Sequence, residues 1–259
     1  MDIEKINGAL EGCDNFLIST GNILSINDIT KKVNLNTSDE LVDAISFTLK
    51  EFQDNGVLQT QSDHLLVISR HNDNLKISEH ELADLKIGFK VFLNSDDPDS
   101  LTEAIQKALI VLKVESINDV IVTFKQKIGN QNDNLNQIQS TWSVLENLIK
   151  KGQIKQIGIA DIEESAFRAL YDWAKVKPSI IQINLSTCCV VPPTLQSFCK
   201  EHDIKLLTHS DPLDLLPVES IESIFGTPLI LKWALRFLIH VKCRGVLTTK
   251  GYLLNLVKN

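Results

Sequence analysis

The sequence predicts an α/β fold in which short apolar strands alternate with amphipathic helices, close to a (β/α)8 barrel. The clearest segment is residues 142–185, where a helix, a strand, a second helix and a second strand follow one another. Alternation at this spacing is typical of a parallel sheet with crossover helices. It continues on both sides without a linker rich in Pro, Gly or Ser, so we expect residues 1–259 to form a single domain.

Turn-forming residues set the boundaries within this segment. The first helix carries apolar side chains at helical spacing from Trp142 and ends at Gly152, a residue typical of helix C-termini. The second helix ends before Pro178, because the residue preceding a proline is disfavoured in the helical conformation. The two strands are expected at residues 156–160 and 180–185, and the first is apolar enough to be buried on both faces.

The remaining elements follow from the same periodicities. Near the N-terminus, Gly21 and Asn22 separate two apolar runs, which predicts a hairpin over residues 16–24. The other strands are expected at residues 65–68, 86–93, 119–124, 205–208 and 245–249, and the other helices at residues 37–52, 101–112, 193–202, 228–240 and 251–258. Residues 54–63, 125–137 and 210–226 are expected to be loops.

The composition argues against two classes of partner. The formal net charge is −7 and the Lys and Arg residues are scattered, whereas nucleic acids and anionic membranes are bound by basic faces. The first residues are acidic and polar, and no apolar run is long enough to span a membrane. We therefore expect no signal peptide and a cytoplasmic protein.

The five cysteines fit reduced thiols better than a disulfide framework or a zinc site, because they are odd in number and lack CxxC spacing. Cys188 and Cys189 are adjacent in an expected strand-to-helix loop, where a reactive or interface role is an alternative to plain burial. No histidine has metal-ligand spacing, so no metal site is expected.

Several segments resemble the aldo-keto reductases. Residues 151–159 are similar to that family's GKIRxIGVSNF signature and residues 182–184 to its NQVEYHP strand. Residues 231–236 resemble its LLRWAL helix, and residues 249–251 its IPKS phosphate-binding turn. The resemblance implies a reductase-type barrel with a shortened C-terminus. In active members, an Asp, Tyr, Lys and His tetrad reduces carbonyls, and the tyrosine is the general acid.

The tetrad is incomplete in this sequence. Lys90 stands at the position of the tetrad lysine, but Phe124 stands at that of the histidine, and neither Tyr171 nor Tyr252 follows the early strand where the acid belongs. Lys250 is a weak candidate for a cofactor phosphate. We expect no catalytic residue and no bound cofactor; an active NADPH-dependent reductase with an unrecognised acid is the alternative.

A closer resemblance, over nearly the whole chain, is to a family within this superfamily, the regulatory (modifier, light) subunits of glutamate–cysteine ligase. It is most specific at residues 184–193 and 206–212. It implies a non-catalytic subunit that forms a heterodimer with the ligase catalytic subunit, raises its affinity for glutamate and weakens feedback by glutathione. A scaffold with other partners is a further alternative. Because barrel proteins place function on the loops after the strands, the partner-binding candidates are Cys188, Cys189, Pro192, Pro193, His209 and Asp211.

Overall fold

The computed structural model describes residues 12–32, 35–55, 59–62, 64–70, 82–95, 97–125, 131–186 and 190–258. The strands are β1 (Asn15–Ser19), β2 (Gln59–Ser62), β3 (Leu65–Ser69), β4 (Leu85–Leu93), β5 (Ile117–Phe124), β6 (Ile154–Ala160), β7 (Ile180–Asn184), β8 (Lys205–His209), β9 (Leu229–Val241) and β10 (Val246–Lys258). The helices are α2 (Asn27–Thr30), α3 (Thr37–Asn55), α5 (Asp99–Leu112), α6 (Gln131–Lys150), α7 (Glu164–Trp173), α8 (Pro193–Glu201) and α9 (Val218–Phe225), with a 3-10 turn η1 (Ile23–Ser25).

The strands form one mixed sheet in the order β2-β3-β1-β10-β9-β4-β5-β6-β7-β8. Strands β4 to β8 are parallel, each paired with the next in register, and the helices α5 to α8 connect them. The expected α/β fold with parallel strands and crossover helices is therefore confirmed. Over the described residues the hydrogen-bonded ladder starts at β2 and ends at β8, and no pairing joins these two strands.

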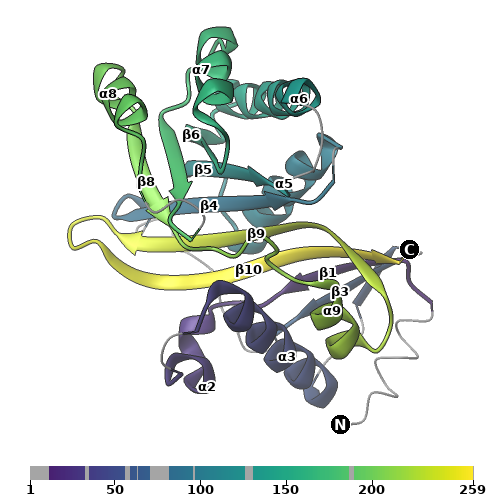
Figure 1. Ribbon diagram of the computed structural model, residues 1–259. Helices are drawn as coiled ribbons and strands as arrows, with labels where there is room; N and C mark the ends of the chain where they lie inside the picture. The colour runs from purple at the N-terminus through teal and green to yellow at the C-terminus, as the bar shows by residue number, and fades with distance from the viewer. Residues whose placement is uncertain are drawn as a thin grey trace.

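The C-terminal part of the chain differs from the sequence prediction. The helices expected at residues 228–240 and 251–258 are wrong, because β9 and β10 instead form a long antiparallel hairpin through the middle of the sheet (Figure 1). Leu231, Trp233, Leu235 and Phe237 recur at every second position, which is the period of a strand. Gly245, with φ of 62°, takes the left-handed conformation in the connecting turn.

The N-terminal hairpin is also wrong. Strand β1 pairs with β10 on one side and with β3 on the other, and the chain beyond it enters η1. The Gly21–Asn22 signal marks a different turn: Gly21 has φ of 62°, and the Asn22 side chain accepts a hydrogen bond from the Leu24 amide at 3.2 Å. The prediction of loops at residues 54–63, 125–137 and 210–226 is wrong in part, because these ranges contain β2, the first turns of α6 and helix α9, respectively.

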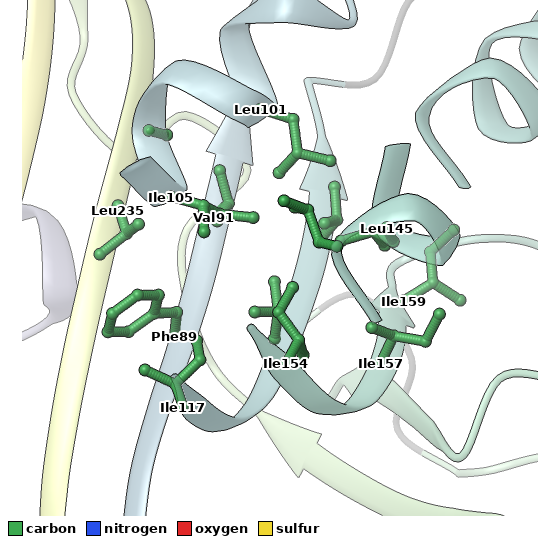
Figure 2. Packing of buried hydrophobic residues seen from close by; sticks show 14 of the residues in the cluster. Phe89, Val91, Leu101, Ile105, Ile117, Leu145, Ile154, Ile157, Ile159 and Leu235 are labelled. Carbon is green, nitrogen blue, oxygen red and sulfur yellow. The ribbon is translucent and has the colours of Figure 1, made fainter. Parts of the chain in front are cut away.

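Two large hydrophobic clusters of the described residues cover the two faces of the sheet, and a small third one consists of Ile121, Ala160 and Ile180. The larger packs α5 and α6 on strands β4, β5, β6 and β9, as the side chains in Figure 2 illustrate. The second packs α3 and α9 on β1, β9 and β10. In Figure 1, α5 to α8 accordingly lie on one side of the β9–β10 hairpin, and α2, α3 and α9 lie on the other. One sheet thus joins both cores.

Candidate functional site

Lys90 lies on β4, directly beside Arg236 of the neighbouring strand β9. Paired residues on adjacent strands point to the same face of the sheet. The neighbours of Lys90 in β4, Phe89 and Val91, point towards α5 and α6, because they belong to the hydrophobic cluster under those helices. Lys90 and Arg236 therefore point to the opposite face. Both side chains are buried, with 5% and 11% of their surface exposed. Two buried cations side by side require a compensating anion.

Asp211, two residues beyond the end of β8, provides that anion. Its Oδ1 accepts a hydrogen bond from Arg236 Nη1 at 2.6 Å, and its Oδ2 accepts from Arg236 Nη2 at 3.1 Å. The Lys90 Nζ atom donates to the same Oδ2 at 2.8 Å. The two cations also lie 5.3 and 5.6 Å from the centroid of the Phe92 ring, within cation–π range. The result is a compact, buried ionic cluster.

Further elements of the fold converge on Asp211. Thr37, the first residue of α3, donates its hydroxyl hydrogen to Oδ1 at 2.8 Å. Asn184, the last residue of β7, donates its amide hydrogen to the Asp211 carbonyl at 2.8 Å. The cluster thus ties together α3, β4, β7 and β9 around the loop that follows β8.

His209 extends the network to a second carboxylate. Its Nε2 atom lies 2.8 Å from Oδ1 of Asp161, in the loop after β6, and the other Asp161 oxygen accepts from the Thr123 hydroxyl at 2.9 Å. Asp161 adopts the left-handed conformation, with φ of 61°, which is uncommon outside glycine. His209, like Asp211, exposes only 6% of its side chain.

The ionisation of these groups follows from burial and from their partners. Burial alone would raise the pKa of Asp211, but the hydrogen bonds from His209 and Arg236 and the charges of Arg236 and Lys90 outweigh burial, so the pKa lies well below its usual range. For His209, burial alone would lower the pKa, but the hydrogen bonds of the ring to Asp161 and Asp211 outweigh burial and raise the pKa. Burial lowers the pKa of Lys90, and Asp211 offsets part of this shift.

The arrangement offers little to a carbonyl substrate. Lys90 donates to Asp211, and Phe124 has no group that could transfer a proton. Tyr252 donates its hydroxyl hydrogen to Glu40 at 2.7 Å, and burial raises its pKa, which is the opposite of what an acid catalyst needs. Lys250 is ion-paired with the same Glu40 carboxylate at 2.6 Å.

The space at this site is small. The cavity bounded by Phe92, Phe124, Asp161 and Asp211 measures about 30 Å³, which is room for about one water molecule rather than for a cofactor and substrate. A larger cavity, of about 480 Å³, lies at the opposite ends of β4 and β5. No three His, Cys, Asp or Glu side chains in the described part of the chain are grouped to hold a metal ion.

The residues predicted as partner contacts fall into three groups. Cys188 and Cys189 lie outside the described residues. Pro192 and Pro193 form the N-terminus of α8, with Pro193 exposed. The side chains of His209 and Asp211 are buried in the ionic cluster, where they anchor the start of the loop that follows β8.

The residues around Asp211 and His209 that sequence reasoning missed include Arg236, Asp161 and Thr37. Arg236 carried a usable signal, because it and Lys232 are the two lysine or arginine residues within an apolar run whose large residues alternate. Asp161 and Thr37 carried none, because nothing in the chain indicates that they approach residues 48 and 174 positions away.

Three exposed apolar side chains lie within two residues of Asn184, His209 or Asp211 along the chain. We call them the apolar rim: Leu185, Leu207 and Leu213, with 44%, 41% and 61% of their surface exposed. They occupy adjoining segments, because the Leu185 amide bonds to the His209 carbonyl at 2.8 Å, at the carboxyl ends of β7 and β8. Single exposed leucines are ordinary, but several on adjoining segments, here β8 and the loops after β7 and β8, are typical of an interaction surface.

Other features of the described residues add constraints. Cys13 and Cys199 are buried and Cys243 is exposed. Burial raises the pKa of the Cys199 thiol, which lowers its reactivity. Within the described ranges, no helix combines the length and the hydrophobicity that crossing a membrane requires.

Comparison with known proteins places this arrangement in a family. The Aldo/keto reductase family model matches residues 71–213. The glutamate–cysteine ligase regulatory subunit of Homo sapiens is 36% identical over 248 residues, covering 92% of this chain and 90% of that protein. The Bos taurus protein of the same name is 35% identical with the same coverage. A putative regulatory subunit from Schizosaccharomyces pombe is 29% identical over 51% of this chain and 53% of its own.

Among solved structures, an aldose reductase from Giardia lamblia is 17% identical, with a TM-score of 0.38, over 65% of this chain and 53% of that chain. The sequence relationships are far stronger, because they extend over almost the whole of both chains at more than a third identity. The chain therefore belongs to the glutamate–cysteine ligase regulatory subunits, a family within the aldo/keto reductases.

Proposed function

We propose that this chain is a single-domain, non-catalytic subunit that binds the catalytic subunit of glutamate–cysteine ligase in the cytoplasm. As a heterodimer it raises the affinity of that enzyme for glutamate and weakens its inhibition by glutathione, and so promotes glutathione synthesis. The observation that carries the proposal is the identity of 35–36% with named regulatory subunits over 92% of this chain. The chemistry of the site agrees with it, because Lys90 is held by Asp211.

The apolar rim is our proposed contact with the catalytic subunit. Leu185 and Leu213 expose large apolar surfaces on loops after strands, where proteins built on parallel strands concentrate their binding residues. Pro193 and the Cys188–Cys189 segment belong to the same β7–α8 connection. His209 and Asp211 take part as positioning residues, because their buried side chains fix the loop that carries Leu213.

Complex formation tests the proposal directly. When purified chain is mixed with purified catalytic subunit, we expect the two to co-elute in size-exclusion chromatography at the mass of a 1:1 heterodimer. Independent elution at micromolar concentrations of both proteins would contradict the proposal.

The alternative, an NADPH-dependent carbonyl reductase, requires a cofactor site and a proton donor. We expect no saturable change in nicotinamide fluorescence when NADPH is titrated with the chain, because the cavity beside Asp211 is about 30 Å³ and Tyr252 donates its hydroxyl hydrogen to Glu40. Saturable binding accompanied by turnover would establish the reductase instead.

A further inference from the structure

One ring nitrogen of His209, Nδ1, lies within hydrogen-bonding distance of two different groups of Asp211, its main-chain amide and its carboxylate. The Nδ1 atom lies 3.1 Å from the main-chain amide nitrogen of Asp211 and also 3.1 Å from the carboxylate oxygen Oδ2 of Asp211. A neutral ring protonated on Nε2 accepts from the amide at Nδ1. A protonated ring carries a hydrogen on Nδ1, so it can only donate to the carboxylate. The two protonation states of His209 therefore hold Asp211 by different atoms.

The remaining contacts of His209 connect this choice to the apolar rim. Its Nε2–H bonds to Asp161 in either state. Its carbonyl accepts the Leu185 amide hydrogen at 2.8 Å, and the Asp211 amide that its ring can hold begins the turn that carries Leu213. His209 is thus hydrogen-bonded to main-chain groups at or beside both Leu185 and Leu213.

The charged groups around the ring favour its protonated form. Asp161 comes from the β6–α7 loop and Asp211 from the loop after β8, and both contact the ring directly. Lys90 of β4 opposes the imidazolium charge, and Arg236 of β9 meets it only through Asp211. Burial also opposes the imidazolium charge, but the two carboxylates in contact outweigh both burial and the cations, so the pKa of His209 is raised.

We propose that His209 is a proton-operated clamp on the loop after β8, and that its imidazolium form fixes the apolar rim for partner binding. In that form the ring holds the Asp211 carboxylate together with Lys90 and Arg236, which completes the ionic cluster. Loss of the proton replaces the charge-assisted bond to the carboxylate with a weaker, neutral bond from the Asp211 amide. The loop is then held less firmly and affinity falls, because a pre-organised surface binds more tightly than one that must order on binding. This inference rests on the proposed function.

The direction of the pH effect follows from the raised pKa of His209. Since the pKa is higher in the folded chain than in the unfolded chain, the protonated clamp is fully present below the unfolded value of about 6.5. It is lost as the pH rises through the higher, folded value. Both the stability of the free chain and its affinity for the catalytic subunit should therefore fall on the alkaline side.

The experiment measures the dissociation constant for the catalytic subunit by calorimetry at pH 6.5 and pH 9 with wild type, His209→Gln and His64→Gln. His64 is a matched surface histidine, with 71% of its side chain exposed. We expect wild type and His64→Gln to lose affinity at least threefold more than His209→Gln, whose side chain does not titrate. Comparing the variants at each pH cancels ionisations of the partner itself.

A second measurement on the free chain separates the clamp from the proposed function. NMR titration should give a His209 pKa above about 6.5 in wild type and a lower one in Asp161→Asn, where one carboxylate charge is removed. Equal pH responses of wild type and His209→Gln in the complex, or a His209 pKa that Asp161→Asn leaves unchanged, would overturn the clamp while the proposed function stands. Absence of binding at every pH would overturn both.

Discussion

Asp211→Asn is expected to lower the free energy of unfolding by about 3–5 kcal/mol, the cost typical of leaving buried charges without their partner. The substitution keeps the shape of the side chain but removes the anion that holds Lys90 and Arg236, both of which remain buried. The measurement is urea unfolding at pH 7, well above the unfolded pKa of about 3.9, where the stabilisation by ionised Asp211 is fully present. It is lost only as the pH falls through the depressed folded pKa.

Asp214→Asn provides the matched control for this prediction. Asp214 is also paired with a lysine, Lys125 at 3.1 Å, but the two side chains are 40% and 46% exposed. Exposed pairs contribute about 0–1 kcal/mol, so the control should be close to wild type. Similar losses in the two variants would show that Asp211 does not anchor a buried cluster.

Leu185→Glu combined with Leu213→Glu is expected to weaken binding of the glutamate–cysteine ligase catalytic subunit at least tenfold, or about 1.4 kcal/mol. Both side chains are exposed in the free chain, so a carboxylate costs nothing there. In the complex it would be desolvated against an apolar partner surface. Calorimetric titration with the catalytic subunit measures the change.

Ile110→Glu is the control for the rim variant. Ile110 is 70% exposed near the C-terminus of α5, just before β5 begins, whereas the rim lies around the carboxyl ends of β7 and β8. Both the double rim variant and Ile110→Glu should unfold within about 0.5 kcal/mol of wild type, as surface substitutions generally do. If Ile110→Glu weakened binding and the double rim variant did not, the partner would bind the helical face instead.

The parallel half of the sheet could be predicted from the sequence because each element there has an unambiguous signal. Strand β4 is a compact apolar run, and α6 ends at Lys150, two residues before Gly152, whose φ of 75° suits glycine. The β9–β10 hairpin was missed because the apolar residues in 231–236 fit the spacing of a helix as well as the alternation of a strand. The resemblance of this segment to a reductase helix favoured the helix. Pairing with β4 and β10, which is decided by tertiary contacts, selects the strand.

The site was predictable only in part, because it too depends on contacts between distant residues. Lys90 was identified by its place at the tetrad lysine position and Asp211 by its place in a loop after a strand, but the bond between them was not predicted. That bond joins residues 121 positions apart and depends on the register of β4 against β9, which places Arg236 beside Lys90. Sequence periodicity specifies which face a side chain takes, but not which distant charge it meets there.

The glutamate dependence of the ligase reaction tests the central claim most directly. The rate of glutamate–cysteine ligation by the catalytic subunit is measured across glutamate concentrations, with and without an equimolar amount of this chain. The account predicts that the chain lowers the glutamate concentration giving half-maximal rate, and that it does so in the absence of NADPH. An unchanged glutamate dependence, with both proteins folded and mixed at concentrations that should form the complex, would contradict it.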